Sequence, residues 1–260
     1  ESEQFESDSS SKNQQNRRQR STSHSGSISL SYSMPLPTMP TLFTLPTLVV
    51  NNSNELIICS ILDGFVVVDN KKHLLYVTKE RKITEYKDII HRQVVCMTSS
   101  EHLIAATGMN GEVFGWDDRN FDQKLQFCCV TSDIVTSIAI SSKFGIVACG
   151  TSSGDLCVFS IHTHMLQFIV KLPAEPSRII ITPSFGFIVV ESNHELFLLS
   201  LNGKIIRRRT VDFVIAKWNA WCCERGIDFI LIADTKGQIR MSEAFYIKFD
   251  EVVFQSKTKI

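Results

Sequence analysis

The sequence predicts an all-β protein, a WD40-like β-propeller of about five recognisable blades behind a disordered amino-terminal segment. Three observations predict this fold class. A short turn recurs along the chain at intervals of 41 to 47 residues, and the same apolar positions flank each copy. Each apolar run is short and bounded by Gly, Asn or Ser, which favours strands over helices. Repeats of about 40–45 residues are typical of propeller blades, each a four-stranded sheet.

The recurring turn carries glycine in all but one of its copies. The turn positions are Gly64, Gly111, Gly154, Glu195 and Gly237. Asp63-Gly64 and Asn110-Gly111 are typical of two-residue hairpin loops, where glycine adopts positive φ without steric cost. Because Glu195 replaces this glycine, we expect a wider turn in the fourth copy.

Apolar residues recur at fixed offsets from each turn. Seven residues before it stand Ile57, Ile104, Val147, Ile188 and Ile230, and two residues after it stand Val66, Val113, Leu156, Phe197 and Ile239. Continuous apolar runs suit strands that are buried on both faces. Blades packed face to face around a ring bury their middle strands in this way. We therefore expect these side chains between neighbouring blades.

Composition restricts the classes of function. The chain has 27 basic and 27 acidic residues, whereas a dedicated nucleic-acid binder normally has a basic excess. The first residues are acidic and serine-rich, so no secretory signal peptide is expected. Prolines interrupt the apolar stretch 34–50, so it is not expected to span a membrane. The chain starts at Glu1, which predicts a fragment or a processed chain. Either five blades close the ring, or sequence upstream supplies others.

The eight cysteines are expected to be reduced thiols in a cytosolic protein, with a set of disulfides as the alternative. None forms a CxxC pair, so a structural zinc site is not expected. Cys59, Cys149 and Cys157 fall in predicted strands, where free cysteine behaves as a small apolar residue. His162 and His164 could share a metal, but the sequence offers no third ligand. No cofactor, metal or small-molecule substrate is expected.

Residues 1–46 are expected to be disordered, first rich in Ser, Gln and Arg and then in proline. They contain too few large apolar groups to offset the entropy of ordering. Arg17, Arg18 and Arg20 precede Ser21, which makes Ser21 a candidate phosphorylation site. The alternative is a solvated charge run in a linker.

The propeller is expected over 47–260, with blades at about 47–92, 93–131, 132–173, 174–211 and 212–260. Its first blade is predicted to have strands at 48–50, 56–61, 65–69 and 74–78, followed by a charged, solvated linker at 79–92. The other predicted strands are 94–98, 103–107, 112–116 and 124–130; 134–140, 146–150, 156–161 and 165–171; 178–182, 187–190, 195–201 and 204–210; and 213–223, 228–233, 238–242 and 245–249. Residues 251–255 start a further element. Asn202-Gly203 is a second hairpin signal in the fourth blade.

Trp116-Asp117 follows Gly111 by five and six residues, where the Trp-Asp dipeptide of WD40 repeats falls. The chain therefore resembles the WD40 family, although the other blades lack this dipeptide and no Gly-His pair opens a blade. In that family the histidine joins a buried hydrogen-bond tetrad with Asp, Ser or Thr, and Trp. Its absence implies that these blades depend more on apolar packing.

Residues 134–250 carry a more specific resemblance. The motifs are Ser141-Ser142-Lys143-Phe144-Gly145-Ile146-Val147, Thr182-Pro183-Ser184-Phe185-Gly186-Phe187-Ile188, Trp218-Asn219-Ala220-Trp221, Asp228-Phe229-Ile230, Ala233-Asp234, Gly237 and Glu243-Ala244-Phe245-Tyr246. In order and spacing they resemble the carboxy-terminal WD40 propeller of BEACH-domain (Beige-like) proteins; the BEACH domain itself is not visible. The resemblance implies a cytoplasmic scaffold at endosomal or lysosome-related membranes, acting in vesicle trafficking, with no catalytic residues.

We expect a non-enzymatic module that binds other proteins, because rigid folds present contact residues on loops. The expected contact turns lie near Asn51, Ser99, Ser142 and Ser184. Another WD40 scaffold, of a coat or signalling complex, is the first alternative. A propeller hydrolase is the second, but it needs acidic or histidine side chains that converge from several blades, and the turns show none repeated.

Arg207, Arg208 and Arg209 fall on the outermost strand of the fourth blade. Charged residues on an exposed edge strand discourage edge-to-edge aggregation. The alternative is a patch for an acidic partner or for the headgroups of an anionic membrane.

Overall fold

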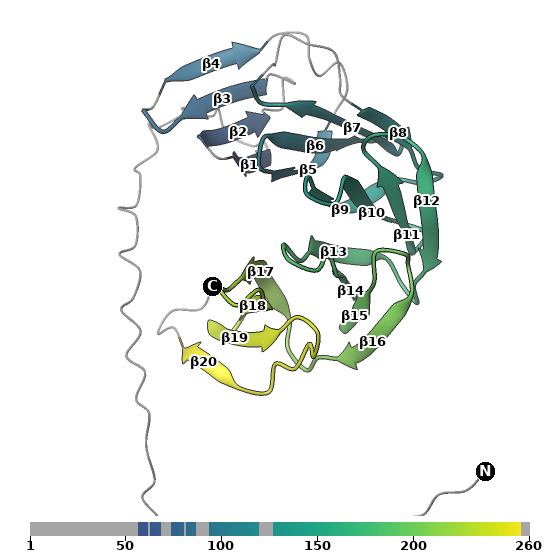
Figure 1. Ribbon diagram of the computed structural model, residues 1–260, viewed down its shortest axis with the longest axis vertical. Coiled ribbons are helices and arrows are strands. Elements are labelled where there is room, and N and C mark those ends of the chain that lie inside the picture. The colour runs from purple at the N-terminus through teal and green to yellow at the C-terminus, as the bar shows by residue number, and fades with distance from the viewer. Residues whose placement is uncertain are drawn as a thin grey trace, which may run out of the picture. The chain divides into compact units, whose positions relative to one another are not determined.

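The computed structural model describes residues 57–61, 63–68, 74–80, 82–86, 94–119 and 127–255. All of them belong to one compact unit, Leu45–Ile260. They form twenty β-strands in five four-stranded antiparallel sheets, so the predicted all-β propeller fold is confirmed. Figure 1 shows the sheets succeeding one another as blades. In the part of the chain so described, no helix is long and apolar enough to cross a membrane.

Each sheet follows the chain order from its first strand to its fourth. The first sheet contains β1 (Ile57–Ile61), β2 (Gly64–Val68), β3 (Leu74–Thr78) and β4 (Ile83–Tyr86), and the second contains β5 (Val94–Ser100), β6 (Leu103–Gly108), β7 (Glu112–Asp117) and β8 (Phe127–Val130). The third contains β9 (Val135–Ser141), β10 (Ile146–Thr151), β11 (Asp155–Ser160) and β12 (Leu166–Lys171), and the fourth contains β13 (Pro176–Ile181), β14 (Ile188–Ser192), β15 (Glu195–Leu199) and β16 (Ile205–Thr210). The fifth contains β17 (Ile215–Cys222), β18 (Asp228–Asp234), β19 (Gln238–Glu243) and β20 (Val252–Gln255). The first strands β1, β5, β9, β13 and β17 contact one another in succession, so they line the inner side of the blades.

The strands predicted for the second, third and fourth sheets are confirmed, with ends that shift by a few residues. In the first sheet the predicted order of strands is wrong. β1 covers the stretch expected as the second strand, and β4 lies inside 79–92, which was expected to be a solvated linker. The linker prediction came from the charged residues on both sides of this short strand. β4 is an edge strand that pairs with β3 alone, with Val77 opposite Ile83 and Leu74 opposite Tyr86. The predicted strand at 48–50 lies outside the described residues.

The fourth strand of the fifth sheet was also misplaced. Residues 245–249 were predicted as that strand, but the strand is β20. The alternating apolar residues of 245–249 instead form a turn, in which the amides of Tyr246 and Ile247 donate to the Glu243 carbonyl. Ile247 and Phe249 are buried in the adjacent core. The apolar residues of this segment are therefore explained by a turn that packs on the core, without a strand.

The turn at Glu195 is tight, and the wider turn expected there is wrong. Ser192 pairs with Glu195, and the two residues between them, Asn193 and His194, have φ of 51° and 59°. Two consecutive positive φ values are typical of a two-residue hairpin turn, and asparagine tolerates them. Gly64 also differs from expectation, because it opens β2 and shows no positive φ. A Cβ there would lie 2.0 Å from the Val77 carbonyl oxygen, so glycine permits a close approach of strands.

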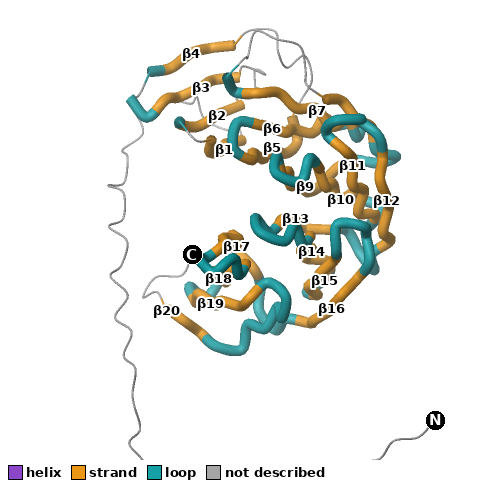
Figure 2. The backbone as a smooth tube through the Cα atoms, in the orientation of Figure 1, coloured by secondary structure: helices purple, strands orange, loops and turns teal. Residues whose placement is uncertain are grey.

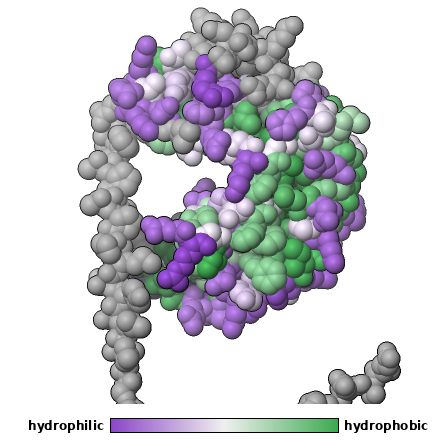
Figure 3. Space-filling model, viewed as in Figure 1, coloured by the Kyte–Doolittle hydropathy of each residue, from purple (hydrophilic) through white to green (hydrophobic). Residues whose placement is uncertain are grey.

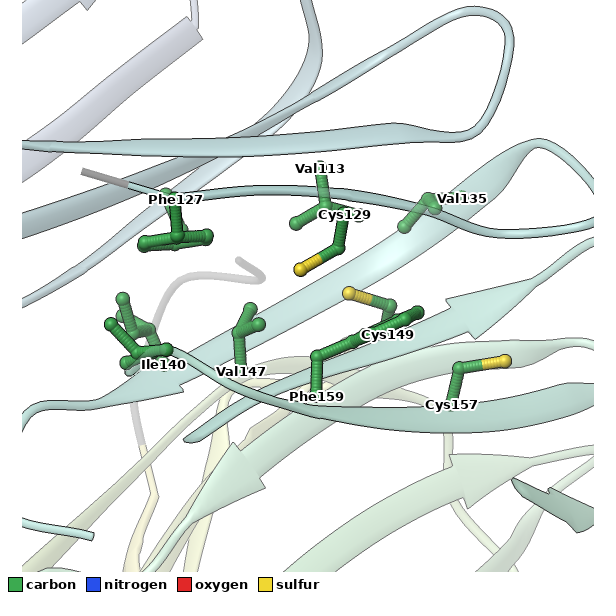
Figure 4. Close-up of a cluster of buried hydrophobic side chains, with 11 residues drawn as sticks. Val113, Phe127, Cys129, Val135, Ile140, Val147, Cys149, Cys157 and Phe159 are labelled. Carbon is green, nitrogen blue, oxygen red and sulfur yellow. The ribbon is translucent and has the colours of Figure 1, made fainter. Parts of the chain in front are cut away.

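The core is divided among the spaces between successive sheets. Of the five side chains seven residues before each turn, Ile104, Val147, Ile188 and Ile230 are fully buried, and Ile57 is half-buried. Figure 4 shows one such core, in which side chains of β7 and β8 face those of β9, β10 and β11. Because each middle strand contributes to a core on both faces, each blade depends on its neighbours for burial of its apolar side chains.

Shortening one of these core side chains tests this dependence. Ile188→Ala should lower the free energy of unfolding by about 2–5 kcal/mol, because it leaves a cavity between the third and fourth sheets. Met165→Ala, at an exposed site in the β11–β12 loop, should change it by less than about 0.5 kcal/mol. Urea denaturation measures both. Equal effects would contradict the packing described here.

Sulfur contributes to the same cores. Cys59, Cys129, Cys149 and Cys157 are buried, and Figure 4 shows the sulfurs of Cys129 and Cys149 in the core between the second and third sheets. Burial raises the pKa of Cys59, Cys129 and Cys157 from 9.0 to about 11, and it raises the pKa of Cys149 as well. Cys128 and Cys222 are exposed.

The raised thiol pKa values predict a loss of stability in alkali. A buried neutral thiol stabilises the fold fully below pH 9, and this contribution is lost as the pH rises through the folded-state pKa. The Tm should therefore fall by several degrees between pH 9 and pH 11. At pH 8, iodoacetamide should modify Cys128 and Cys222 first, as peptide mass spectrometry would show. Early modification of Cys149 would contradict the structure.

Candidate interaction face

The loops between the first and second strands of each sheet lie on the same side of the unit as those between the third and fourth, because successive strands alternate in direction. We call these loops together the loop face; they can be followed in Figure 2. Ser142 and Ser184 belong to it, Ser99 lies beside it near the end of β5, and Asn51 lies outside the described residues. The structure thus brings three of the four predicted contact turns to one side.

Hydrogen bonds join the second sheet to its neighbours at this face. The Ser99 hydroxyl donates to the Ser60 carbonyl of the first sheet. On the other side, the Ser142 amide donates to Ser100 Oγ at 3.1 Å, and the Ser142 hydroxyl donates to Glu101 Oε2 at 2.8 Å. The β5–β6 and β9–β10 loops are therefore fixed to each other by side chains.

The series continues into the fourth and fifth sheets. Lys143 Nζ donates to the carbonyls of Pro183 and Ser184, at 2.9 and 3.1 Å. The amides of Ser184 and Phe185 in turn donate to the Asp228 carboxylate, each at 2.9 Å. Asp228 is only 2% exposed, so its charge is shielded from water and committed to this loop. Sequence reasoning found the loops but missed these partners, which lie some forty residues apart.

Removing the Asp228 carboxylate tests whether it holds the β13–β14 loop. Asp228→Ala should lower the free energy of unfolding by about 1–3 kcal/mol, because it leaves two loop amides without their charged acceptor. The amides of Ser184 and Phe185 should exchange with solvent faster, as hydrogen-exchange mass spectrometry would show. Asp212→Ala, at an exposed residue on the connection between the fourth and fifth sheets, is the control and should leave both readouts unchanged.

Trp116 and Asp117 do not share a hydrogen-bond network. Trp116 is buried, and no group in the described structure accepts a hydrogen bond from its Nε1. Asp117 accepts hydrogen bonds from the Arg119 amide and Nε at 2.9 and 2.8 Å, and the Arg119 side chain lowers the pKa of Asp117. Asp118 accepts one from His102 Nδ1 at 2.9 Å, while burial raises the Asp118 pKa. The blade is thus held chiefly by apolar packing.

The three consecutive arginines do not share one environment. Arg208 lies over Phe197 and pairs with Glu195, and Arg209 Nη2 lies 2.8 Å from Asp250 Oδ1. Arg207 instead donates from Nε to the Phe245 carbonyl at 2.8 Å. That all three arginines form one patch for an anionic partner remains a prediction. Glu195 and Asp250 neutralise two of the three charges, which would weaken the attraction of such a patch for an anion.

An aromatic group that the sequence reasoning missed lies beside Arg207 on the loop face. Ring centroids are 5.7 Å apart for Phe185 and Phe187, 6.1 Å for Phe187 and Phe245, and 5.4 Å for Phe245 and Tyr246. Phe185 and Tyr246 are 58% and 52% exposed. Figure 3 shows hydrophobic surface over the region that carries β10 to β16. The Phe-Gly-Phe and Phe-Tyr motifs are the sequence signal that could have indicated this group.

The remaining candidate residues form no site of their own. His162 and His164 lie in the β11–β12 turn, and no group of three potential ligands suited to a metal is found among the described residues. Ser21 lies outside those residues. A pocket of about 570 Å³ lies near the connection between the fourth and fifth sheets. Its Arg240 is committed within the fold, stacked 4.7 Å from the Phe213 ring and donating to the Phe249 carbonyl at 3.0 Å.

No protein-family model matches the chain, and no curated protein does. Among solved structures it is similar to BamB from Moraxella catarrhalis, at 18% identity with a TM-score of 0.47 over 63% of this chain and 47% of that one. It is also similar to BBS1N in two crystals of its complex with ARL6DN, at 13% identity in one soaked with lead and 12% in one soaked with mercury. Both give a TM-score of 0.58 over 69% of this chain and 60% of that one. The chain spans less than two thirds of these proteins, and the likeness to BBS1N shows the β-propeller fold.

Proposed function

We propose that this chain is a non-enzymatic scaffold that binds partner proteins through its loop face. The observation that carries the proposal is the series of hydrogen bonds from Ser60 to Asp228 that fixes successive loops. Loops held in one conformation lose little entropy on binding, which favours recognition by contact residues on them. BBS1N, a propeller of similar fold, forms a complex with ARL6DN, which supports protein partners for this chain as well.

Binding rather than catalysis is proposed because three of the buried carboxylates are held by partners within the fold. Asp228 holds loop amides, and Asp117 and Glu191 pair with arginines at their own blades. A propeller hydrolase needs an acid and a base that are free to act at one point, and these groups are dispersed and committed.

The finer proposal concerns the cellular setting. The motifs of residues 134–250 support the propeller portion of a BEACH-family protein, a cytoplasmic scaffold in vesicle and endolysosomal trafficking. A coat or signalling scaffold is the alternative. The identity of captured partners separates these two settings.

Affinity capture tests the proposal with a matched pair of variants. The wild-type chain and the variants Lys143→Glu and Lys236→Glu would be immobilised and incubated with cytosol, and the bound proteins quantified by mass spectrometry. Lys143 lies on the loop face, whereas Lys236 lies in the β18–β19 turn on the opposite side. Lys143→Glu should reduce capture of the specific partners at least about tenfold, equivalent to about 1.4 kcal/mol.

Lys236→Glu should leave capture unchanged. Equal capture by all three proteins, or no protein enriched over an unrelated control propeller, would contradict binding through the loop face. The unfolding midpoint of each variant must match the wild type, so that a loss of capture reports on the surface.

A further inference from the structure

Arg207 differs from the two arginines that follow it because it forms no ion pair with a carboxylate of the described residues. Glu195 neutralises Arg208 and Asp250 neutralises Arg209, whereas no acidic side chain of the described residues pairs with Arg207. Among the described residues, the Arg207 side chain makes one hydrogen bond, in which Nε donates to the Phe245 carbonyl at 2.8 Å. The two terminal amino groups of an exposed guanidinium therefore remain available to an acceptor from outside the chain.

Aromatic rings surround this guanidinium. Its central carbon lies 4.8 Å from the Phe245 ring centroid and 5.6 Å from that of Tyr246. The ring of Phe187 packs against that of Phe245, and the ring of Phe185 packs against that of Phe187, so the series of ring contacts continues along the β13–β14 loop. Arginine and large aromatic residues dominate the energetics of protein interfaces, and contiguous exposed apolar groups mark interaction sites.

The two loops that carry the rings are fixed to one residue. The Asp228 carboxylate accepts the amides of Ser184 and Phe185, and the Asp228 carbonyl accepts the Ala244 amide at 2.8 Å. Asp228 thereby sets the β13–β14 loop and the β19–β20 loop against each other. The rings and the guanidinium are thus held in place before any partner arrives, which reduces the entropy lost on binding.

We infer that a binding site for a peptide segment of a partner protein is formed by Arg207, Phe185, Phe245 and Tyr246. This inference rests on the proposed scaffold function. The segment would carry an acidic residue beside an aromatic or large aliphatic one. Guanidinium N–H groups in a planar fork match a carboxylate bidentately, and the adjacent rings bury an apolar side chain. A membrane surface fits less well, because anionic lipids attract clusters of four to eight basic residues, and the neighbouring arginines are neutralised.

Peptide selection on the intact chain tests this site. A phage library of random twelve-residue peptides would be selected on the immobilised wild-type chain and counter-selected on Arg207→Gln. The enriched peptides should share an acidic residue within a few positions of an aromatic or aliphatic one. The affinity of one such synthetic peptide is then measured by fluorescence anisotropy for each variant.

Arg207→Gln should weaken this peptide at least tenfold, and Arg207→Lys should weaken it less, because lysine keeps the charge but loses the fork. Phe185→Ala should also weaken it, whereas Lys236→Gln on the opposite side should not. Replacing the acidic peptide residue by its amide should cause the same loss as Arg207→Gln, with no further loss when both are combined. Unfolding midpoints equal to that of the wild type would show that each variant is folded.

The inference would be overturned if no peptide were enriched, or if the enriched peptides lacked an acidic residue. It would also be overturned if Arg207→Gln left the peptide affinity unchanged. Binding of the chain to phosphatidylserine vesicles, lost in Arg207→Gln, would show that the site binds a membrane instead. The capture experiment with Lys143→Glu separates the two proposals. If Lys143→Glu reduces capture while Arg207→Gln has no effect on peptides, only the peptide site fails; if no partner is captured through the loop face, the scaffold function fails.

Discussion

The structure depends on burial of apolar side chains between neighbouring blades. Ile104, Val147, Ile188 and Ile230 stand at the same place in successive sheets, and each fills a space that its own sheet cannot close. A single four-stranded sheet leaves both of its faces open, so it gains stability only when another sheet covers it. This requirement explains the continuous apolar strands and the strict spacing of the repeats.

The same stacking places the loops of different blades within hydrogen-bonding distance. Ser142 reaches Ser100 and Glu101, and Lys143 reaches Ser184, only because the sheets are packed at a fixed separation. Asp228 is the most committed of these groups, since it serves two loops and is almost fully buried. Packing in the interior thus prepares the surface on which we place the binding function.

The apolar repeat was sufficient to predict the sheets, but it failed where strand and turn have similar composition. Charged residues on both sides of β4 made 79–92 resemble a linker, and 245–249 are mostly apolar although they form a turn. The tight turn at Asn193-His194 was missed because Glu195 stands where the other copies have glycine, while the two residues before it adopt the positive φ values. Of the candidate site, the serine turns were predicted, but the group of Arg207, Phe185 and Tyr246 was not, since its members come from β16 and from two separate loops.

The sequence by itself determined the all-β fold, the period of the blades and the residues that fill the cores. These features follow from the spacing of apolar residues within each short segment of the chain. Only the tertiary structure decided which loop residues meet, which of the three arginines has no carboxylate partner among the described residues and which rings lie against it. Those outcomes depend on contacts between residues some forty positions apart, and the distance between two such residues is set by how neighbouring sheets pack, not by the chain between them.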